Sequence, residues 1–149
     1  MIPIAGFLHP SRAVDLRATT KREALEEICG VLAGAPGVSD PASLLRAVLE
    51  REEVLSTGIG LGIAAPHAKI ASVKEFVVAL GRTKQGIDFG SLDGKPVRLV
   101  VLIAGPEGHQ ARYLQLLAGV SLRLKREEVR NALLAAKDPG EMAAILGEA

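Results

Sequence analysis

The sequence has a single cysteine, Cys29, so the chain cannot form an internal disulfide, and we expect a reducing, cytoplasmic location. Cys29 falls on the apolar side of an expected helix, and we interpret it as a small buried side chain rather than a reactive thiol. The N-terminus lacks the basic region and long apolar run of a secretory signal. No apolar stretch approaches the length of a membrane span, which agrees with the same location.

An excess of charge of either sign is also absent. The 149 residues include 18 Lys and Arg against 17 Asp and Glu, which gives a formal net charge of +1. Proteins that bind nucleic acid or an anionic membrane surface usually carry a basic excess, so we expect neither partner. Hydrophobic residues make up 48% of the chain, and this length suffices for a proper core, so we expect a single domain spanning residues 1–149.

Three familiar patterns of functional residues are missing. The glycines of residues 58–62 follow an expected helix and enter an expected strand, and no Lys-Ser or Lys-Thr pair follows them, which excludes a nucleotide-binding loop. The chain has no Gly-x-Ser-x-Gly turn, so we reject a serine hydrolase. A metal site would use His67 and His109, but these are far apart in sequence and lack a compact ligand motif, so we expect no metal.

The hydrophobic pattern predicts a chain of both helices and strands. Helices are expected at about 21–33, 41–53, 109–124, 125–134 and 139–146, three of them after the capping residues Thr20, Asp40 and Asp138. Strands are expected at 13–16, 76–80 and 97–104, with a separate short extended piece at 86–89. This order predicts one sheet with helices packed against it, in the α/β or α+β class.

The stretch from Ser56 to Lys69 is the most unusual part of the sequence. Its three alternate glycines make a helix costly, and Pro66 pushes the residue before it towards an extended backbone. We therefore predict a glycine-rich turn that runs into a short strand and presents His67 at its end, in a loop. By itself, His67 could be a structural histidine that caps this loop.

The surroundings of His67 favour a chemical role. A neutral imidazole, with an ordinary pKa of about 6.5, is available as a nucleophile at cytoplasmic pH. A phosphoryl group on it would need donors and positive charge, which Lys69, Arg51 and the Thr57 hydroxyl could supply. Arg51 belongs to the charged run 50–53, whose carboxylates we interpret as the solvated last turn of a helix.

His109 is the second candidate residue. It stands in the first turn of the helix that follows the longest strand, where free amides and the helix dipole favour an anion and disfavour an extra proton on the imidazole.

These residues together resemble the active-site signature of the fructose/mannitol-type enzyme IIA domain of the bacterial phosphoenolpyruvate-dependent phosphotransferase system. The similarity covers nearly the whole chain and includes His109 and the Leu-rich helix after it. The segments that carry it best are Arg51-Glu52, Ser56–Gly60, Gly62–Ala64, Pro66–Lys69 and Phe89–Val97.

The resemblance implies a mixed sheet flanked by helices on both faces and a phosphotransferase that needs no cofactor beyond a covalent phosphohistidine. It implies that His67 accepts a phosphoryl group from the phosphocarrier protein HPr and passes it to a cysteine of an enzyme IIB domain. It further implies that His109 lies beside His67 and supports the phosphoryl group, and that Arg51 lines the same pocket.

A stand-alone chain of this length, with Val14–Leu16 ahead of the first helix, is most similar to the nitrogen-regulatory branch of that family. Our main hypothesis is therefore a histidine phosphocarrier that acts mainly as a phosphorylation-dependent regulator of a target protein. Two alternatives stay open. One is a sugar-specific enzyme IIA that passes phosphate to enzyme IIB, and the other is a non-catalytic partner-binding module on the same fold.

Overall fold

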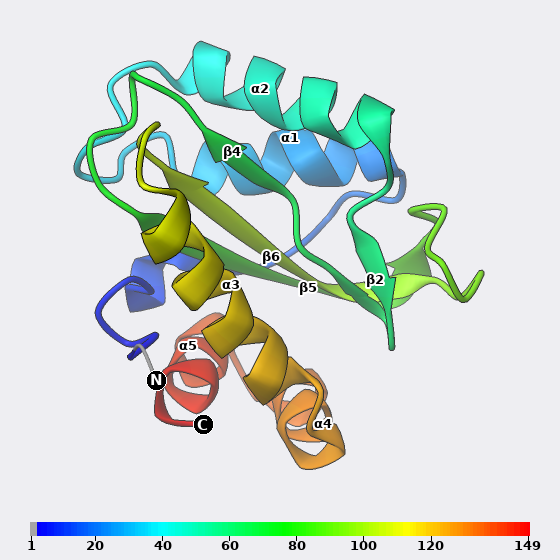
Figure 1. Cartoon of the computed structure of the whole chain (residues 1–149). Helices are drawn as coiled ribbons and strands as arrows, with labels where there is room; N and C mark the ends of the chain where they lie inside the picture. Colours follow the sequence, from blue (N-terminus) through cyan, green and yellow to red (C-terminus); the bar gives the residue numbers. More distant parts are fainter. Residues whose placement is uncertain (1–2) are drawn as a thin grey trace.

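The computed structural model describes residues 3–149 as a six-stranded sheet with helices on both faces (Figure 1). The strands are β1 (Ala13–Asp15), β2 (Gly58–Gly60), β3 (Ile63–Ala64), β4 (His67–Lys69), β5 (Val77–Ile87) and β6 (Val97–Gly105). The helices are α1 (Lys21–Val31), α2 (Pro41–Val54), α3 (Gln110–Leu124), α4 (Glu127–Ala135) and α5 (Pro139–Glu148), with a short 3-10 turn η1 (Pro10–Arg12). None of the helices in this range is long and apolar enough to cross a membrane.

The sheet is mixed. Its strand order is β1-β5-β6-β3-β2, and β4 pairs with β6 as well. β5 runs antiparallel to β6, whereas β3 and β4 run parallel to it. Helices α1 and α2 cover one face and α3, α4 and α5 the other, as Figure 1 shows. The predicted α/β architecture, a mixed sheet flanked by helices on both faces, is confirmed.

The helix starts follow the capping residues named from the sequence. The Thr20 hydroxyl accepts a hydrogen bond from the Glu23 amide at 3.2 Å, and the Glu23 carboxylate accepts one from the Thr20 amide, which completes a capping box. Asp40 and Asp138 accept bonds from amides in the first turns of α2 and α5, each ahead of a proline at the first helical position. These local signals set the helix boundaries independently of the sheet.

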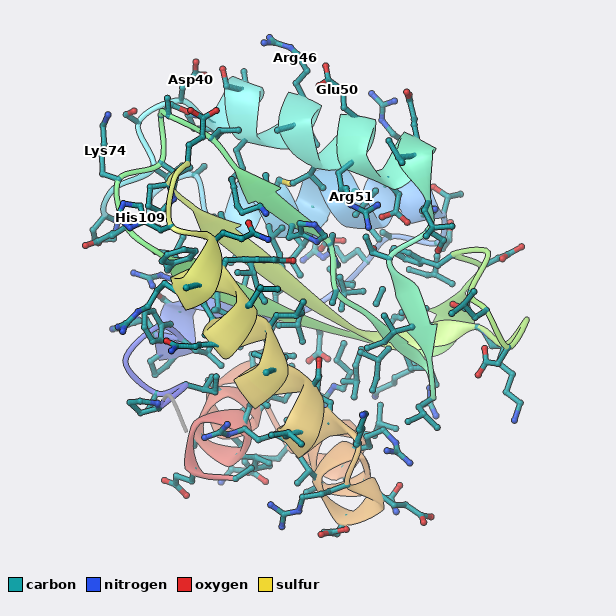
Figure 2. The ribbon with its side chains drawn as sticks, in the orientation of Figure 1. Asp40, Arg46, Glu50, Arg51, Lys74 and His109 are labelled. Atoms are coloured by element: carbon teal, nitrogen blue, oxygen red, sulfur yellow. The ribbon has the colours of Figure 1, made fainter. Side chains whose placement is uncertain are left out.

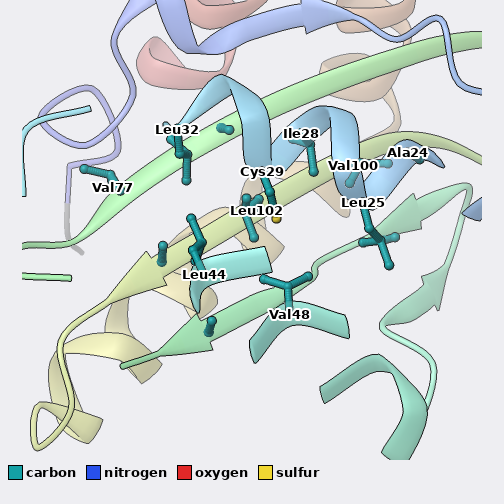
Figure 3. Packing of buried hydrophobic residues seen from close by; sticks show 14 of the residues in the cluster. Ala24, Leu25, Ile28, Cys29, Leu32, Leu44, Val48, Val77, Val100 and Leu102 are labelled. Carbon is teal, nitrogen blue, oxygen red and sulfur yellow. The ribbon is translucent and has the colours of Figure 1, made fainter. Parts of the chain in front are cut away.

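Strand β6 is the centre of the core because its two faces belong to different clusters. Its even-numbered residues Val100 and Leu102 pack with α1 and α2 (Figure 3). Its odd-numbered residues Val101 and Ile103 pack with α3 and α5. A strand buried on both faces reads as a continuous apolar run, which is why the sequence predicted it well.

Cys29 lies inside the first of these clusters, between α1 and the sheet (Figure 3). Only 3% of the residue is exposed, and burial raises the pKa of the thiol to about 12. A thiol of this kind is protonated and shielded at neutral pH, so it is a poor nucleophile. The interpretation of Cys29 as a buried apolar side chain is confirmed.

Strand β5 is longer than the sequence indicated. We expected a strand at 76–80 and a separate extended piece at 86–89, but one strand, Val77–Ile87, runs from the first into the start of the second. In its middle, Arg82 is 4% exposed, pairs with Asp15 at 2.7 Å and donates to carbonyl oxygens at the end of α4. The prediction was wrong because an arginine after an apolar run looks in the sequence like the end of a buried strand. The partners that allow Arg82 to be buried come from distant segments.

The glycine turn before His67 forms as predicted. Gly60, Leu61 and Gly62 have φ values of 92°, 60° and 77°, which place three successive residues in the left-handed region. The turn joins β2 to β3, and the Asp93 carboxylate accepts a hydrogen bond from the Leu61 amide at 3.1 Å. A short strand, β3, follows it.

The end of α2 is fastened to this segment by Glu52, which was expected to be solvated with its neighbours. Glu52 is instead only 8% exposed. Its carboxylate accepts hydrogen bonds from the Thr57 amide at 2.9 Å and from the Thr57 hydroxyl at 2.6 Å, and it pairs with Lys21 of α1 at 2.6 Å. The prediction was wrong because the partners of this carboxylate come from a turn and a distant helix, which helical periodicity does not register.

We expect Glu52→Ala to lower the free energy of unfolding by about 3 kcal/mol, since it leaves the buried Thr57 amide without its acceptor and removes the carboxylate that pairs with Lys21. Chemical denaturation measures this. The matched control is Glu53→Ala at the exposed neighbouring position, with an expected change within about 0.5 kcal/mol. Equal losses for the two variants would contradict the anchoring role of Glu52.

Candidate functional site

His67 is the first residue of strand β4 and not part of a loop, which corrects the prediction for this position. β4 pairs in parallel with β6, so that His67 lies opposite Ile103. The Ile103 amide donates to the Pro66 carbonyl at 3.0 Å, and the Ala65 amide donates to the Thr57 carbonyl at 3.0 Å. Sequence reasoning missed β4 because this pairing is non-local and Pro66 interrupts the extended run.

The His67 ring is held in one tautomer by its own backbone. Nδ1 lies 3.3 Å from the Ala65 carbonyl oxygen, which can only accept a hydrogen bond. Nδ1 therefore carries the ring proton and donates it to Ala65, and Nε2 keeps its lone pair. The residue is partly exposed.

Burial and neighbouring charges keep this imidazole neutral. Burial is the largest cause that lowers the pKa of His67 below its usual value, and the positive charges of Arg51 and Lys69 lower it further. The hydrogen bond to Ala65 and the charge of Glu52 oppose this shift without reversing it. Since the net direction is downward, the neutral imidazole is the favoured form at neutral pH.

The ring that lies beside His67 belongs to Tyr113 of α3. The two ring centroids are 5.2 Å apart and the planes are tilted by 41°. Lys69 closes the same corner, with Nζ 4.4 Å from the Tyr113 ring centroid and 2.6 Å from Oε1 of Gln110. Sequence reasoning did not select Tyr113, although it lies one helical turn beyond His109, on the same face of α3.

His109 is the N-cap residue of α3 and makes no capping hydrogen bond through its side chain. It is exposed, and it lines a surface depression together with Arg12, Lys74, Phe76 and Arg112. Figure 2 shows it well separated from Arg51, whose charge acts on His67. The position against the His67 ring, which the resemblance gave to His109, is filled by Tyr113, and a catalytic role of His109 stays a prediction.

The remaining candidate residues are placed differently. Arg51 lies close enough for its charge to add to the lowering of the His67 pKa by burial and to oppose the raising of the Tyr113 pKa by burial. Its Nη1 donates to the Leu55 carbonyl at 2.7 Å. Thr57 is 4% exposed and its hydroxyl donates to Glu52, so this hydroxyl is already engaged. The phosphate-binding roles of Thr57 and Lys69 stay predictions.

The site offers a neutral nitrogen nucleophile with two cations nearby. Within residues 3–149, no group of three or more His, Cys, Asp or Glu side chains could hold a metal ion. An anionic electrophile such as a phosphoryl group fits this arrangement, because Arg51 and Lys69 offset its charge.

We expect Lys69→Met to raise the pKa of His67, because the substitution removes a cation that disfavours the imidazolium form while keeping a long side chain. Titration of the His67 C2 proton by NMR measures the shift. The control is Lys74→Met, a lysine whose Nζ donates to the Ala71 carbonyl, with no change expected. A His67 pKa that is unchanged or lower in Lys69→Met would contradict this electrostatic description.

Comparison with protein families gives a match over residues 11–149 to the family described as phosphoenolpyruvate-dependent sugar phosphotransferase system, EIIA 2. The fructose-specific EIIABC component of Bacillus subtilis is 40% identical over 135 residues; these cover 91% of this chain but only 21% of that protein, so the chain spans about a fifth of that relative's length. A nitrogen regulatory protein of Bradyrhizobium diazoefficiens is 31% identical over 146 residues, which cover 97% of this chain and 95% of that protein.

Among solved structures, the nitrogen regulatory protein IIA-Ntr of Neisseria meningitidis superposes with a TM-score of 0.89 at 30% sequence identity, covering 96% of this chain and 98% of that one. The similarity therefore extends to the sugar-specific and to the nitrogen-regulatory members. The chain belongs to the EIIA 2 family of the phosphoenolpyruvate-dependent sugar phosphotransferase system, whose members are phosphotransferases, as the sequence resemblance predicted.

Proposed function

We propose that this chain is a histidine phosphocarrier in which Nε2 of His67 accepts a phosphoryl group from an HPr-type phosphocarrier. The observation that carries the proposal is the contact of Nδ1 with the Ala65 carbonyl at 3.3 Å, which leaves Nε2 as the free nucleophile of a neutral ring. The family supports phosphotransfer as the chemistry.

The proposed step is a transfer between two imidazoles. The lone pair of Nε2 attacks the phosphorus of the donor phosphohistidine, a new N–P bond forms, and the donor ring leaves with the electrons of the broken N–P bond. The His67 ring becomes positively charged as the bond forms. The hydrogen bond that Nδ1 donates to the Ala65 carbonyl oxygen stabilises this charge. Lys69 and Arg51 offset the negative charge on the phosphoryl oxygens. The covalent phosphohistidine needs no added cofactor.

Regulation is the main role in this proposal, and a target protein that distinguishes the two forms is the partner. The support is the full-length similarity to nitrogen regulatory proteins, in sequence and in fold. Phosphorylation adds roughly two negative charges at one point of the surface, which changes the complementarity with a partner. We place the chain in the cytoplasm and treat residues 1–149 as one domain.

The second candidate is a sugar-specific enzyme IIA that passes the phosphoryl group to an enzyme IIB cysteine. The 40% identity with part of a fructose-specific EIIABC component favours it. Transfer of label from phosphorylated chain to an isolated IIB domain separates the two roles. A non-catalytic binding module is disfavoured, because His67 keeps a nucleophilic tautomer and nearby cations.

The test is incubation with phosphoenolpyruvate, enzyme I and HPr, with acid-labile phosphate on the chain as the readout. We expect label on the wild type, none on His67→Ala, and wild-type label on the control His9→Ala at an exposed histidine. For His109→Ala, slower labelling supports the assisting role implied by the resemblance, and labelling at the wild-type rate removes that role. An unlabelled wild type, or label that survives in His67→Ala, would overturn the phosphocarrier proposal.

A further inference from the structure

Tyr113 stands at the candidate phosphorylation site with no role assigned so far. The centroid of its ring lies 5.2 Å from the centroid of the His67 ring. Nζ of Lys69 lies 4.4 Å from the Tyr113 ring centroid. The residue is only 4% exposed, and its hydroxyl has no hydrogen-bond partner within residues 3–149. A hydroxyl in such a place is available to a group that arrives on His67.

The register between α3 and β4 explains why Tyr113 meets His67. Gln110, the first residue of α3, bonds Lys69 at the end of β4. His67 lies two residues back along the strand, or about 6.6 Å at a rise of roughly 3.3 Å per residue. A helix rises about 1.5 Å per residue, so the residue opposite His67 is about four positions beyond Gln110. Tyr113 is three positions beyond, and it faces the sheet.

The protonation of Tyr113 suits it to donate. Burial raises the pKa of its hydroxyl and outweighs the opposing effect of the Arg51 charge, so the phenol keeps its proton at neutral pH. A phosphoryl group on Nε2 brings acceptor oxygens to this corner, and a hydrogen bond to a charged acceptor is stronger than one to a neutral group. Unlike an imidazole, a phenol adds no second titrating group near pH 7.

We propose that Tyr113 binds the phosphoryl group on His67, with its hydroxyl donating a hydrogen bond to a phosphoryl oxygen while its ring packs against the imidazole. This rests on the phosphocarrier function proposed above. Tyr113 keeps its proton and is not itself phosphorylated, so its effect is to stabilise the phosphorylated state. The site therefore uses a tyrosine where the family resemblance implies a second histidine.

The first test is Tyr113→Phe, which removes one oxygen and keeps the ring. We expect the equilibrium constant for phosphoryl transfer from HPr to fall about tenfold, the effect of losing one hydrogen bond to a charged group. Ser121→Ala on the same helix removes a hydroxyl elsewhere and should keep the wild-type constant. The midpoint of thermal unfolding checks that both variants are folded.

The second test needs no substitution in α3, because Tyr113 is the only tyrosine and the chain has no tryptophan. Spectrophotometric titration of the phenol should give a higher pKa in the phosphorylated wild type than in the free protein, since the phosphoryl charge opposes tyrosinate formation. His67→Ala treated with the same donors should show no such shift.

In one outcome the wild type takes label while Tyr113→Phe keeps the wild-type equilibrium constant and the phenol titration stays unchanged. That result would overturn the role of Tyr113 and leave the proposed function standing. A wild type that takes no label would overturn the proposed function and this inference together.

Discussion

The candidate site depends on the pairing of one short strand with the most buried strand of the sheet. β4 is only three residues long, yet its neighbours Pro66 and Ile70 are tied to Ile103 and Gly105 of β6 by backbone hydrogen bonds of 3.0 Å. β6 in turn is buried on both faces by helices. His67, the proposed nucleophile, is therefore carried by a strand attached to the buried centre of the fold, which positions a side chain more accurately than a loop does.

The charges around His67 are likewise fixed before any phosphoryl group arrives. Gln110 holds the Lys69 ammonium and the Leu55 carbonyl holds the Arg51 guanidinium, so neither cation must be ordered at the moment of reaction. Burial lowers the pKa of His67 most, and the same two cations lower it further. The same positive charges therefore suit both the free and the phosphorylated form of His67. They disfavour a proton on the imidazole and favour an anion attached to it.

Sequence reasoning predicted the features whose cause is local. The capping box at Thr20 and the apolar run of β6 are each determined by a few adjacent residues, and both form as expected. The features it missed depend on contacts between distant segments. Glu52 is buried because Lys21 and the turn at Thr57 surround it, and β5 continues through Arg82 because Asp15 and α4 satisfy the guanidinium.

The site itself divides in the same way. His67 could be selected from the residues around it, whereas the partner of its ring depends on how α3 lies along β4. A shift of one helical turn separates the exposed His109 from Tyr113, and only the packed structure fixes that register.

Long-range ¹H–¹⁵N NMR of the imidazole, before and after phosphorylation, measures whether the Ala65 carbonyl fixes the His67 tautomer. We expect the ring proton on Nδ1 in the free protein and phosphorus bonded to Nε2 in the phosphorylated one. A proton on Nε2, or phosphorus on Nδ1, would contradict this expectation.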